Sequence, residues 1–169
     1  LDKVTAAIYK SQADIVAFSC YIWNISQQLI IAERLKMVKP QATIIFGGPE
    51  VSFQPGKLMA ENPFIDYIIR GEGEKPLNLL LKHLINNSYN TCHNLEEIPG
   101  LVYKDKENIL EKELYLMPNL KEIPGIYQIE DINKLSNKII YYETTRGCPF
   151  NCSYCLSSTF SGVRYFPMD

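Results

Sequence analysis

The sequence is poor in histidine and in net charge, and it has no long apolar run. Its 169 residues include 2 histidines and carry a formal net charge of −2, so charge gives no reason to expect nucleic acid or an anionic membrane as a partner. No apolar run approaches the roughly 20 residues that cross a bilayer, and the first residues show no signal-peptide pattern. With 46% hydrophobic and 21% charged residues, the composition is that of a soluble globular protein, which we expect in the cytoplasm.

What the sequence does have is a group of cysteines near its C-terminal end. Three of the five cysteines, Cys148, Cys152 and Cys155, follow the spacing C-x3-C-x2-C. One short loop with this spacing can place three thiolates around an iron–sulfur cluster, which usually takes four thiolate ligands. With no fourth cysteine nearby, one iron would stay open to another ligand. An open position is what distinguishes a reactive metal site from a closed structural one.

Two other uses of these cysteines fit the sequence less well. A zinc site usually has four ligands in two separated pairs, and both histidines are distant from the cysteines in the sequence. A disulfide framework is typical of small secreted chains with an even number of cysteines, whereas this chain has five. Cys20, at the end of a predicted strand, is interpreted as a small apolar filler of the core.

Three short apolar runs rich in β-branched residues predict strands that are buried on both faces of a sheet. They are Ala13–Cys20, Ala42–Phe46 and Asp66–Arg70. A helical pattern follows each of them, and the first predicted helix begins at Asn24, which would form a capping box with Gln27. Strands that alternate with helices predict an α/β fold, a doubly wound parallel sheet with right-handed crossovers.

Ligands bind beyond the carboxyl ends of the strands in such sheets. The residues expected there are Ser19–Asn24, Gly47–Glu50 and Gly71–Glu74. The glycines of the last two loops either allow a ligand to approach the backbone closely or only make tight turns, and the sequence leaves both interpretations open. A G-x-G-x-x-G motif is absent, so dinucleotide binding has little support.

The pattern changes after residue 85. Gly100–Tyr103, a polar turn and Ile109–Leu110 predict a β-hairpin, and the proline-containing segment that follows is interpreted as an extended connector. Lys138–Tyr142 predicts another strand. The cysteine loop follows the carboxyl end of this strand, which is where barrel enzymes place their sites.

The cysteine loop resembles that of a known family. Glu143–Pro149, the C-x3-C-x2-C spacing and the aromatic Tyr154 before the last cysteine are similar to the cluster loop of radical S-adenosylmethionine enzymes, in the subgroup with an N-terminal cobalamin-binding-type domain. The resemblance implies that Cys148, Cys152 and Cys155 ligate a [4Fe–4S] cluster. It also implies that the fourth iron chelates S-adenosylmethionine, that Tyr154 lies near the adenine, and that flavodoxin or ferredoxin donates the electron.

The N-terminal half carries a second resemblance. The segments Ile44–Glu50 and Ile68–Glu74 resemble the loops of the cobalamin-binding-type domains in the same enzymes. The resemblance implies that these loops surround the corrin ring and the nucleotide tail. The implied cofactor-binding residues are Ser19, Gly47, Gly48, Gly71 and Gly73. The D-x-H-x-x-G motif found in some cobalamin proteins is not among the residues present, so retention of cobalamin stays open.

Together the two resemblances imply three regions. Residues 1–85 would be a Rossmann-like (flavodoxin-like) domain of the cobalamin-binding type, residues 86–137 a hairpin and connector, and residues 138–169 the first strand and cluster loop of a partial (β/α) barrel. We expect a fragment, inactive by itself, of a longer enzyme.

The implied reaction of that enzyme is reductive cleavage of S-adenosylmethionine to a 5′-deoxyadenosyl radical, with methyl transfer to a substrate radical if cobalamin is bound. The substrate cannot be identified from these residues. Two alternatives remain. One is a cobalamin-free radical enzyme in which the N-terminal domain is a scaffold. The other is a non-catalytic small-molecule-binding module with an electron-transfer cluster.

Overall fold

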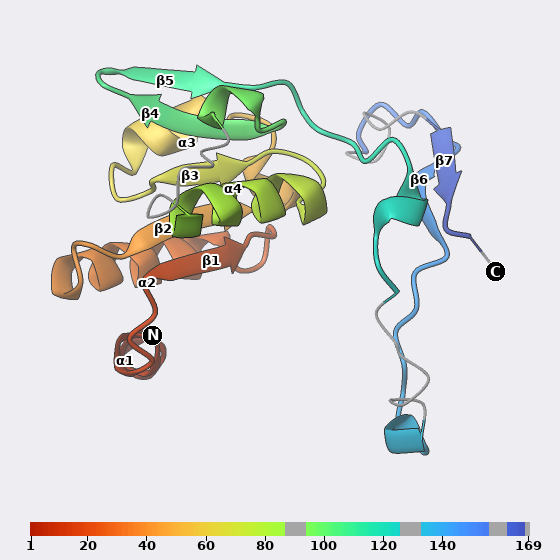
Figure 1. Cartoon of the computed structure of the whole chain (residues 1–169), viewed down its shortest axis with the longest axis horizontal. Coiled ribbons are helices and arrows are strands. Elements are labelled where there is room, and N and C mark those ends of the chain that lie inside the picture. The colour runs from red at the N-terminus through yellow and green to blue at the C-terminus, as the bar shows by residue number, and fades with distance from the viewer. Residues whose placement is uncertain (87–93, 126–132, 156–161, 168–169) are drawn as a thin grey trace. The chain divides into compact units, whose positions relative to one another are not determined.

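The chain folds into two compact units, Leu1–Leu116 and Met117–Asp169. The computed structural model describes residues 1–86, 94–125, 133–155 and 162–167, and Figure 1 shows their secondary structure. The first unit holds an α/β sheet, and the second holds the three clustered cysteines.

The first unit is built on a five-stranded sheet with the strand order β1-β2-β3-β4-β5. Its strands are β1 (Ile15–Ser19), β2 (Thr43–Gly47), β3 (Tyr67–Ile69), β4 (Leu101–Asp105) and β5 (Asn108–Glu111). The first three strands are parallel, which confirms the prediction made from the apolar runs. The predicted hairpin forms as well, but β4 pairs antiparallel with β3, so the sheet continues beyond residue 85.

Helices cover both faces of this sheet (Figure 1). They are α1 (Asp2–Lys10), α2 (Ile25–Val38), α3 (Pro55–Glu61) and α4 (Glu74–Asn86), with a short 3-10 helix η1 (Pro49–Val51) after β2. On one face, Phe46 and Ile68 pack with Leu35 of α2 and Met59 of α3. On the other face, Ile45 and Ile69 pack with Leu80 of α4. Both layers are fully buried, so helix-covered faces are the main source of stability here.

The strand β1 is not buried on both faces, which corrects one expectation. It lies at the edge of the sheet, and its Ala17 and Ser19 are exposed. On one face of the sheet, α4 packs against Ile45 and Ile69, which belong to β2 and β3 and not to β1. Among the described residues, α2 and α3 pack on the opposite face. The face of β1 on the α4 side therefore stays uncovered. The uncovered face of β1 leads directly to the cavity described below.

The helix α2 has Asn24 as its N-cap residue, as predicted, but the capping box is absent. The Asn24 Oδ1 atom accepts a hydrogen bond from the backbone N–H of Tyr21 at 2.8 Å, and its Nδ2 donates to the Ser19 carbonyl at 3.1 Å. Because Asn24 bonds backward along the chain, its oxygen does not cap the helix. Asn24 instead stabilises the loop between β1 and α2.

A buried lysine holds the amino edge of the sheet. The Lys39 side chain is 7% exposed, and its Nζ donates to the carbonyls of Gln12 and Ala13 at 3.0 and 2.9 Å and to Asp14 Oδ1 at 3.2 Å. We expect Lys39→Met to lower the free energy of unfolding by about 1–3 kcal/mol, because it keeps the length of the side chain but leaves carbonyl acceptors without their donor. Urea denaturation followed by circular dichroism measures this.

The matched control for that change is Lys57→Met. Lys57 is 67% exposed and its Nζ lies 3.9 Å from Glu61 Oε1, so the pair is solvated and contributes little. An equal loss of stability in the two variants would contradict the structural role given to Lys39.

The second unit contains a two-stranded antiparallel sheet of β6 (Thr145–Cys148) and β7 (Gly162–Tyr165). It also contains two short 3-10 helices, η3 (Leu120–Glu122) and η4 (Asn133–Leu135). The prediction of a strand at Lys138–Tyr142 was wrong, because these residues form no strand. Ile139 and Tyr141 are 88% and 86% exposed, and β-branched apolar residues do not form a strand without a partner to bond. The strand β6 begins at Thr145, three residues after the predicted end at Tyr142, and carries Cys148 itself.

Candidate functional site

The loops that follow β1, β2 and β3 line one cavity of about 480 Å³. All five residues predicted to bind a cofactor belong to its wall: Ser19, Gly47, Gly48, Gly71 and Gly73. The remaining wall is mostly apolar and includes Ala17, Ile45 and Ile69, and Glu74 is the one charged residue among the described residues that line it. A concave, largely apolar space of this size, with a few polar groups, is typical of a small-molecule or cofactor site.

Two of the four glycines are required by the fold itself. Gly48 and Gly71 have φ angles of 105° and 93°. A Cβ atom would lie 2.7 Å from the Cys20 carbonyl oxygen at Gly48 and 2.1 Å from the Tyr115 carbonyl oxygen at Gly71. For these two residues the tight-turn interpretation holds, since any side chain would clash with backbone.

The other two glycines leave room for a ligand. A Cβ atom built on Gly47 or Gly73 would have its nearest heavy atom, in Ile69, at 3.9 Å, which is an ordinary van der Waals contact. The protein therefore does not need glycine at these positions for its own packing. Both residues line the cavity, so the lack of a side chain keeps the space open and lets a ligand approach the backbone.

The first loop is held by side-chain amides and presents an aromatic pair. The Ser19 carbonyl accepts hydrogen bonds from Asn24 Nδ2 at 3.1 Å and Gln28 Nε2 at 2.8 Å. In the same loop the rings of Tyr21 and Trp23 stack, with their centroids 4.7 Å apart and 7° between their planes. Tyr21 lines the cavity. It belongs to the segment Ser19–Asn24 that was expected at the ligand-binding edge, but it was not among the residues predicted to bind a cofactor.

The thiol of Cys20 lies in the core beneath these loops. It is fully buried and donates a hydrogen bond to the Phe18 carbonyl at 3.6 Å, which confirms the interpretation as an apolar filler. Burial raises the pKa of Cys20 to about 12, and the nearby Glu50 carboxylate adds to the shift. The thiol is therefore protonated at neutral pH and shielded from reagents.

We expect Cys20 to escape alkylation by iodoacetamide at pH 8 in the folded protein, while Cys148, Cys152 and Cys155 react. The three clustered thiols are partly exposed, and alkylation requires an accessible thiolate. Mass spectrometry of the digested protein measures the modified fraction at each cysteine, and denaturant should make Cys20 reactive. Equal labelling of Cys20 and Cys148 before denaturation would be inconsistent with this core.

None of the three cysteines predicted as cluster ligands forms a disulfide. Cys148 ends β6, and Cys152 and Cys155 belong to the turn after it, in which the Cys155 N–H donates to the Cys152 carbonyl at 3.1 Å. Among the residues that the structure describes, no three His, Cys, Asp or Glu side chains converge on a metal position. Tyr154 is 90% exposed. The donor set fits an iron–sulfur cluster in its chemistry, since three cysteine thiols that form no disulfide lie on one loop.

An ion pair supports the start of the cysteine loop. The Arg146 Nε and Nη2 atoms lie 3.1 and 3.0 Å from Glu143 Oε2, and the guanidinium lies 5.4 Å from the ring centroid of Phe166. Its side chain is 17% exposed, so solvent screens the pair only in part. The Phe166 N–H donates to the Thr144 carbonyl at 2.9 Å. These contacts connect the segment before Cys148 to the end of β7.

The glycine before the first cysteine fixes how close β6 and β7 approach. Gly147 has a φ of 100°, and a Cβ atom there would lie 2.1 Å from the Gly162 carbonyl oxygen. We expect Gly147→Ala to separate the two strands and to reduce iron bound after reconstitution by about half or more. Iron analysis measures this. Gly125→Ala, with no heavy atom within 4 Å of the added Cβ, is the control and should bind normal amounts of iron.

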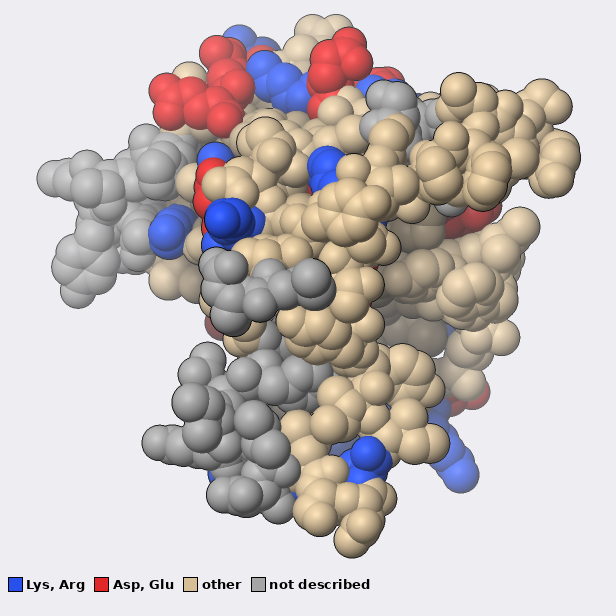
Figure 2. All heavy atoms as spheres, turned by 90° about the vertical axis from the view of Figure 1, so that its right-hand side faces the viewer, with Lys and Arg blue, Asp and Glu red and all other residues tan. Residues whose placement is uncertain are grey.

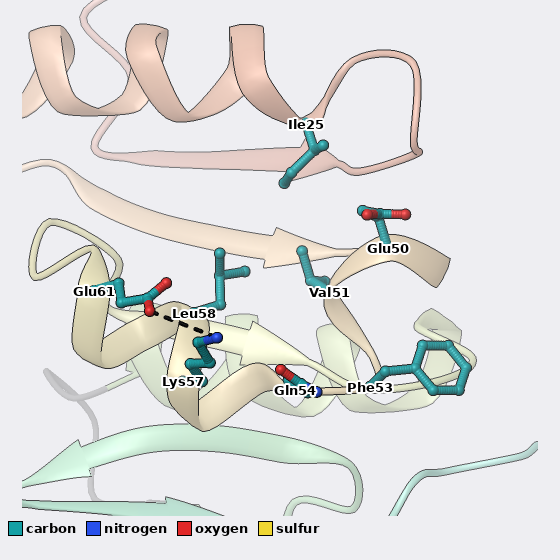
Figure 3. A pocket seen from close by; sticks show the side chains of 8 residues that line it. All are labelled: Ile25, Glu50, Val51, Phe53, Gln54, Lys57, Leu58 and Glu61. Carbon is teal, nitrogen blue, oxygen red and sulfur yellow. Dashed lines mark ion pairs between the residues drawn. The ribbon is translucent and has the colours of Figure 1, made fainter.

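Two further cavities contain none of the predicted site residues. One, of about 330 Å³, lies between the start of α2, η1 and α3, and Figure 3 shows the ion pair of Lys57 and Glu61 at one end and Glu50 and Phe53 at the other. The other, of about 630 Å³, is mainly apolar and lies between α1 and α2. Figure 2 shows one face of the molecule, which is mostly uncharged, with acidic and basic side chains close together at its top.

Comparison with known proteins agrees with this division into a cavity and a cysteine loop. The family model for the B12 binding domain matches residues 1–81, which contain all three loops of the cavity. The Streptomyces tokunonensis protein named cobalamin-dependent radical SAM methyltransferase TokK is 28% identical over 166 residues, which cover 92% of this chain and 24% of TokK. Residues 1–81 therefore match a B12 binding domain, and the chain as a whole is similar to radical S-adenosylmethionine enzymes.

Relatives of the chain differ in the reaction that their names give. The anaerobic magnesium-protoporphyrin IX monomethyl ester cyclase of Cereibacter sphaeroides is 28% identical over 166 residues, which cover 91% of this chain and 26% of the cyclase. The chain thus spans about a quarter of the length of these relatives.

A solved structure shows the same fold. The radical S-adenosylmethionine methyltransferase TsrM from Kitasatospora setae, solved with tryptophan and an S-adenosylmethionine analogue, matches with a TM-score of 0.62 and 16% identity, over 96% of this chain and 34% of TsrM. In the present chain the sheet extends beyond residue 81, where the match to the B12 binding domain ends, through β4 and β5. None of the described helices is both long and apolar enough to span a membrane.

Proposed function

We propose that the complete protein is a cobalamin-dependent radical S-adenosylmethionine enzyme that transfers a methyl group. The observation that carries the proposal is the presence, in one chain, of a glycine-lined cavity in the region that matches a B12 binding domain and a loop with three cysteines spaced C-x3-C-x2-C. Either feature alone would fit a binding module or an electron carrier. The pair fits an enzyme that cleaves S-adenosylmethionine beside a methyl carrier.

Each part of the chain has a distinct task in this proposal. Cys148, Cys152 and Cys155 would hold the cluster, and Tyr154 would lie near the adenine of the cosubstrate. Gly47 and Gly73 keep the cavity open, and the exposed face of β1 at Ala17 extends its apolar wall. When bound, the cluster and cobalamin supply reductive cleavage of S-adenosylmethionine and methyl transfer, while the protein supplies binding, orientation and exclusion of water.

The proposal also includes the location of the enzyme, its electron donor and the position of its substrate pocket. An oxygen-sensitive cluster and free thiols require a reducing compartment, which supports a cytoplasmic location. A flavodoxin or ferredoxin would donate the electron. The substrate pocket would lie in the part of the enzyme that the relatives contain and this chain does not.

A second candidate is a radical cyclase, which is favoured by the 28% identity to the magnesium-protoporphyrin ester cyclase. Both reactions begin with cleavage of S-adenosylmethionine, but only methyl transfer also consumes its methyl group. The distinguishing product is S-adenosylhomocysteine, which a methyltransferase forms in addition to 5′-deoxyadenosine. A cyclase that uses cobalamin for other steps forms 5′-deoxyadenosine alone.

The experiment uses the complete protein, reconstituted without air with iron, sulfide and hydroxocobalamin. After addition of S-adenosylmethionine and a reductant, chromatography quantifies 5′-deoxyadenosine and S-adenosylhomocysteine. The proposal predicts both products. A protein that binds iron but forms neither product would be an electron carrier, and a protein that forms 5′-deoxyadenosine but retains no corrin after gel filtration would be a cobalamin-free radical enzyme.

A further inference from the structure

The side chain of Ser52 connects the two glycine loops of the cavity. Ser52 follows η1 and is 1% exposed. Its hydroxyl donates a hydrogen bond to the Gly48 carbonyl at 2.9 Å and accepts one from the Gly71 backbone N–H at 3.0 Å. One hydroxyl thus acts as donor to the loop after β2 and as acceptor from the loop after β3.

The backbone of Ser52 adds a second connection to the end of β3. The Arg70 Nε donates to the Ser52 carbonyl at 2.7 Å. The bond to Gly48 spans four residues and is a local turn contact, whereas the bonds to Gly71 and Arg70 span 19 and 18 residues. The long-range bonds are the ones that set the distance between the loops.

Both glycines that Ser52 contacts have positive φ angles and contact backbone elsewhere. Gly48 packs on Cys20, and Gly71 packs on Tyr115. Each loop also has a backbone hydrogen bond to another segment. In the loop after β2 the Glu50 N–H donates to the Cys20 carbonyl, and in the loop after β3 the Glu72 N–H donates to the Tyr115 carbonyl. The Ser52 hydroxyl bonds these two loops to each other. Loss of the hydroxyl would leave a partly buried carbonyl and a partly buried N–H without this partner.

We infer that Ser52 is a positioning residue, whose hydroxyl fixes the separation of the Gly48 and Gly71 loops and so the shape of the cavity that receives cobalamin. Ser52 is not among the residues that line the cavity, so it acts through the glycines and not by contact with the ligand. This inference rests on the proposed function. It adds a residue that neither the cysteine motif nor the glycine loops point to.

The test compares Ser52→Thr with Ser52→Val in the complete protein. The two side chains have nearly the same shape, and only threonine keeps the hydroxyl. We expect hydroxocobalamin, titrated by its absorbance after separation from free cofactor, to bind Ser52→Thr close to wild type and Ser52→Val about tenfold or more weakly, since two bonds of the loop backbone are lost. Ser52→Ala, which adds no atoms to the core, should show the same loss.

A stability control separates positioning from general weakening. Asn62→Ala removes a side-chain bond to the Leu58 carbonyl, 2.8 Å long, at the end of α3, where the chain enters the amino end of β3. We expect this variant to lower the unfolding midpoint as Ser52→Ala does, and to keep wild-type affinity for hydroxocobalamin.

The outcomes distinguish the inference from the proposed function. If wild type and Ser52→Thr bind hydroxocobalamin but Ser52→Val and Ser52→Ala bind equally well, the role of Ser52 is refuted and the proposed function stands. The role is also refuted if Asn62→Ala weakens binding as much as Ser52→Ala. If the wild-type protein itself does not bind hydroxocobalamin, the cobalamin part of the proposed function fails, and the inference about Ser52 fails with it.

Discussion

Replacement of Cys148, Cys152 or Cys155 by alanine removes nearly all of the iron that the complete protein retains after reconstitution without air. The wild type should hold about four iron atoms per chain, as expected for a cubane cluster. Each single change leaves two protein thiolates, and the cluster then lacks ligands at two corners. Cleavage of S-adenosylmethionine should fall by about a thousandfold or to background, since no other described group supplies the electron. Iron analysis and quantified 5′-deoxyadenosine measure the two effects.

The control for these variants is Cys20→Ala. Cys20 is fully buried in the first unit, and its thiol has a pKa raised to about 12 by burial, so it is unsuited to ligate iron. Cys20→Ala should keep wild-type iron content, although loss of the buried sulfur will cost some stability. Wild-type iron in Cys152→Ala, or loss of iron in Cys20→Ala with the fold intact, would mean that the cluster is held elsewhere.

Gly47→Val abolishes cobalamin binding without unfolding the protein. Gly47 ends β2, where a β-branched residue is favourable, and its Cβ would meet the nearest heavy atom, in Ile69, at 3.9 Å. The remaining atoms of the valine enter the cavity and occupy the space of a ligand. We expect the affinity for hydroxocobalamin to fall by about a hundredfold or more, and the unfolding midpoint to stay near wild type.

Two neighbouring changes make this prediction specific. Gly47→Ala adds one carbon and should weaken binding less than Gly47→Val. Gly48→Ala should instead lower the unfolding midpoint, because its Cβ would lie 2.7 Å from the Cys20 carbonyl oxygen in a backbone with a φ of 105°. If Gly47→Val binds hydroxocobalamin like wild type, the cavity between these loops is not the cofactor site.

Local pattern was sufficient to predict the elements that carry the cavity. The apolar runs predicted β1 to β3, because buried parallel strands need continuous β-branched residues, and Gly48 and Gly71 marked the turns after them. The prediction that β1 is buried on both faces was wrong. Whether a helix covers Ala17 depends on tertiary packing, which a local sequence pattern does not show. For the same reason the pattern did not show that β4 would pair with β3.

The sequence was less informative about contacts between distant segments. The predicted capping box at Asn24 was wrong, because the Asn24 Oδ1 atom accepts a hydrogen bond from the Tyr21 N–H, three residues earlier. An asparagine at this position can bond either backward along the chain or to the first turn of the helix, and the sequence does not decide between the two. The strand expected at Lys138–Tyr142 formed further along, where β7 supplies a partner for Thr145–Cys148. The link from Ser52 to Gly71 spans 19 residues and has no signature in the sequence.

The most direct test of the account is metal analysis of the complete protein, reconstituted without air in the presence of iron, sulfide and hydroxocobalamin and then passed through a gel-filtration column. The account predicts an equimolar amount of cobalt and about four iron atoms in the protein peak. Iron without cobalt would contradict the assignment of the glycine-lined cavity, and cobalt without iron would contradict the role of Cys148, Cys152 and Cys155.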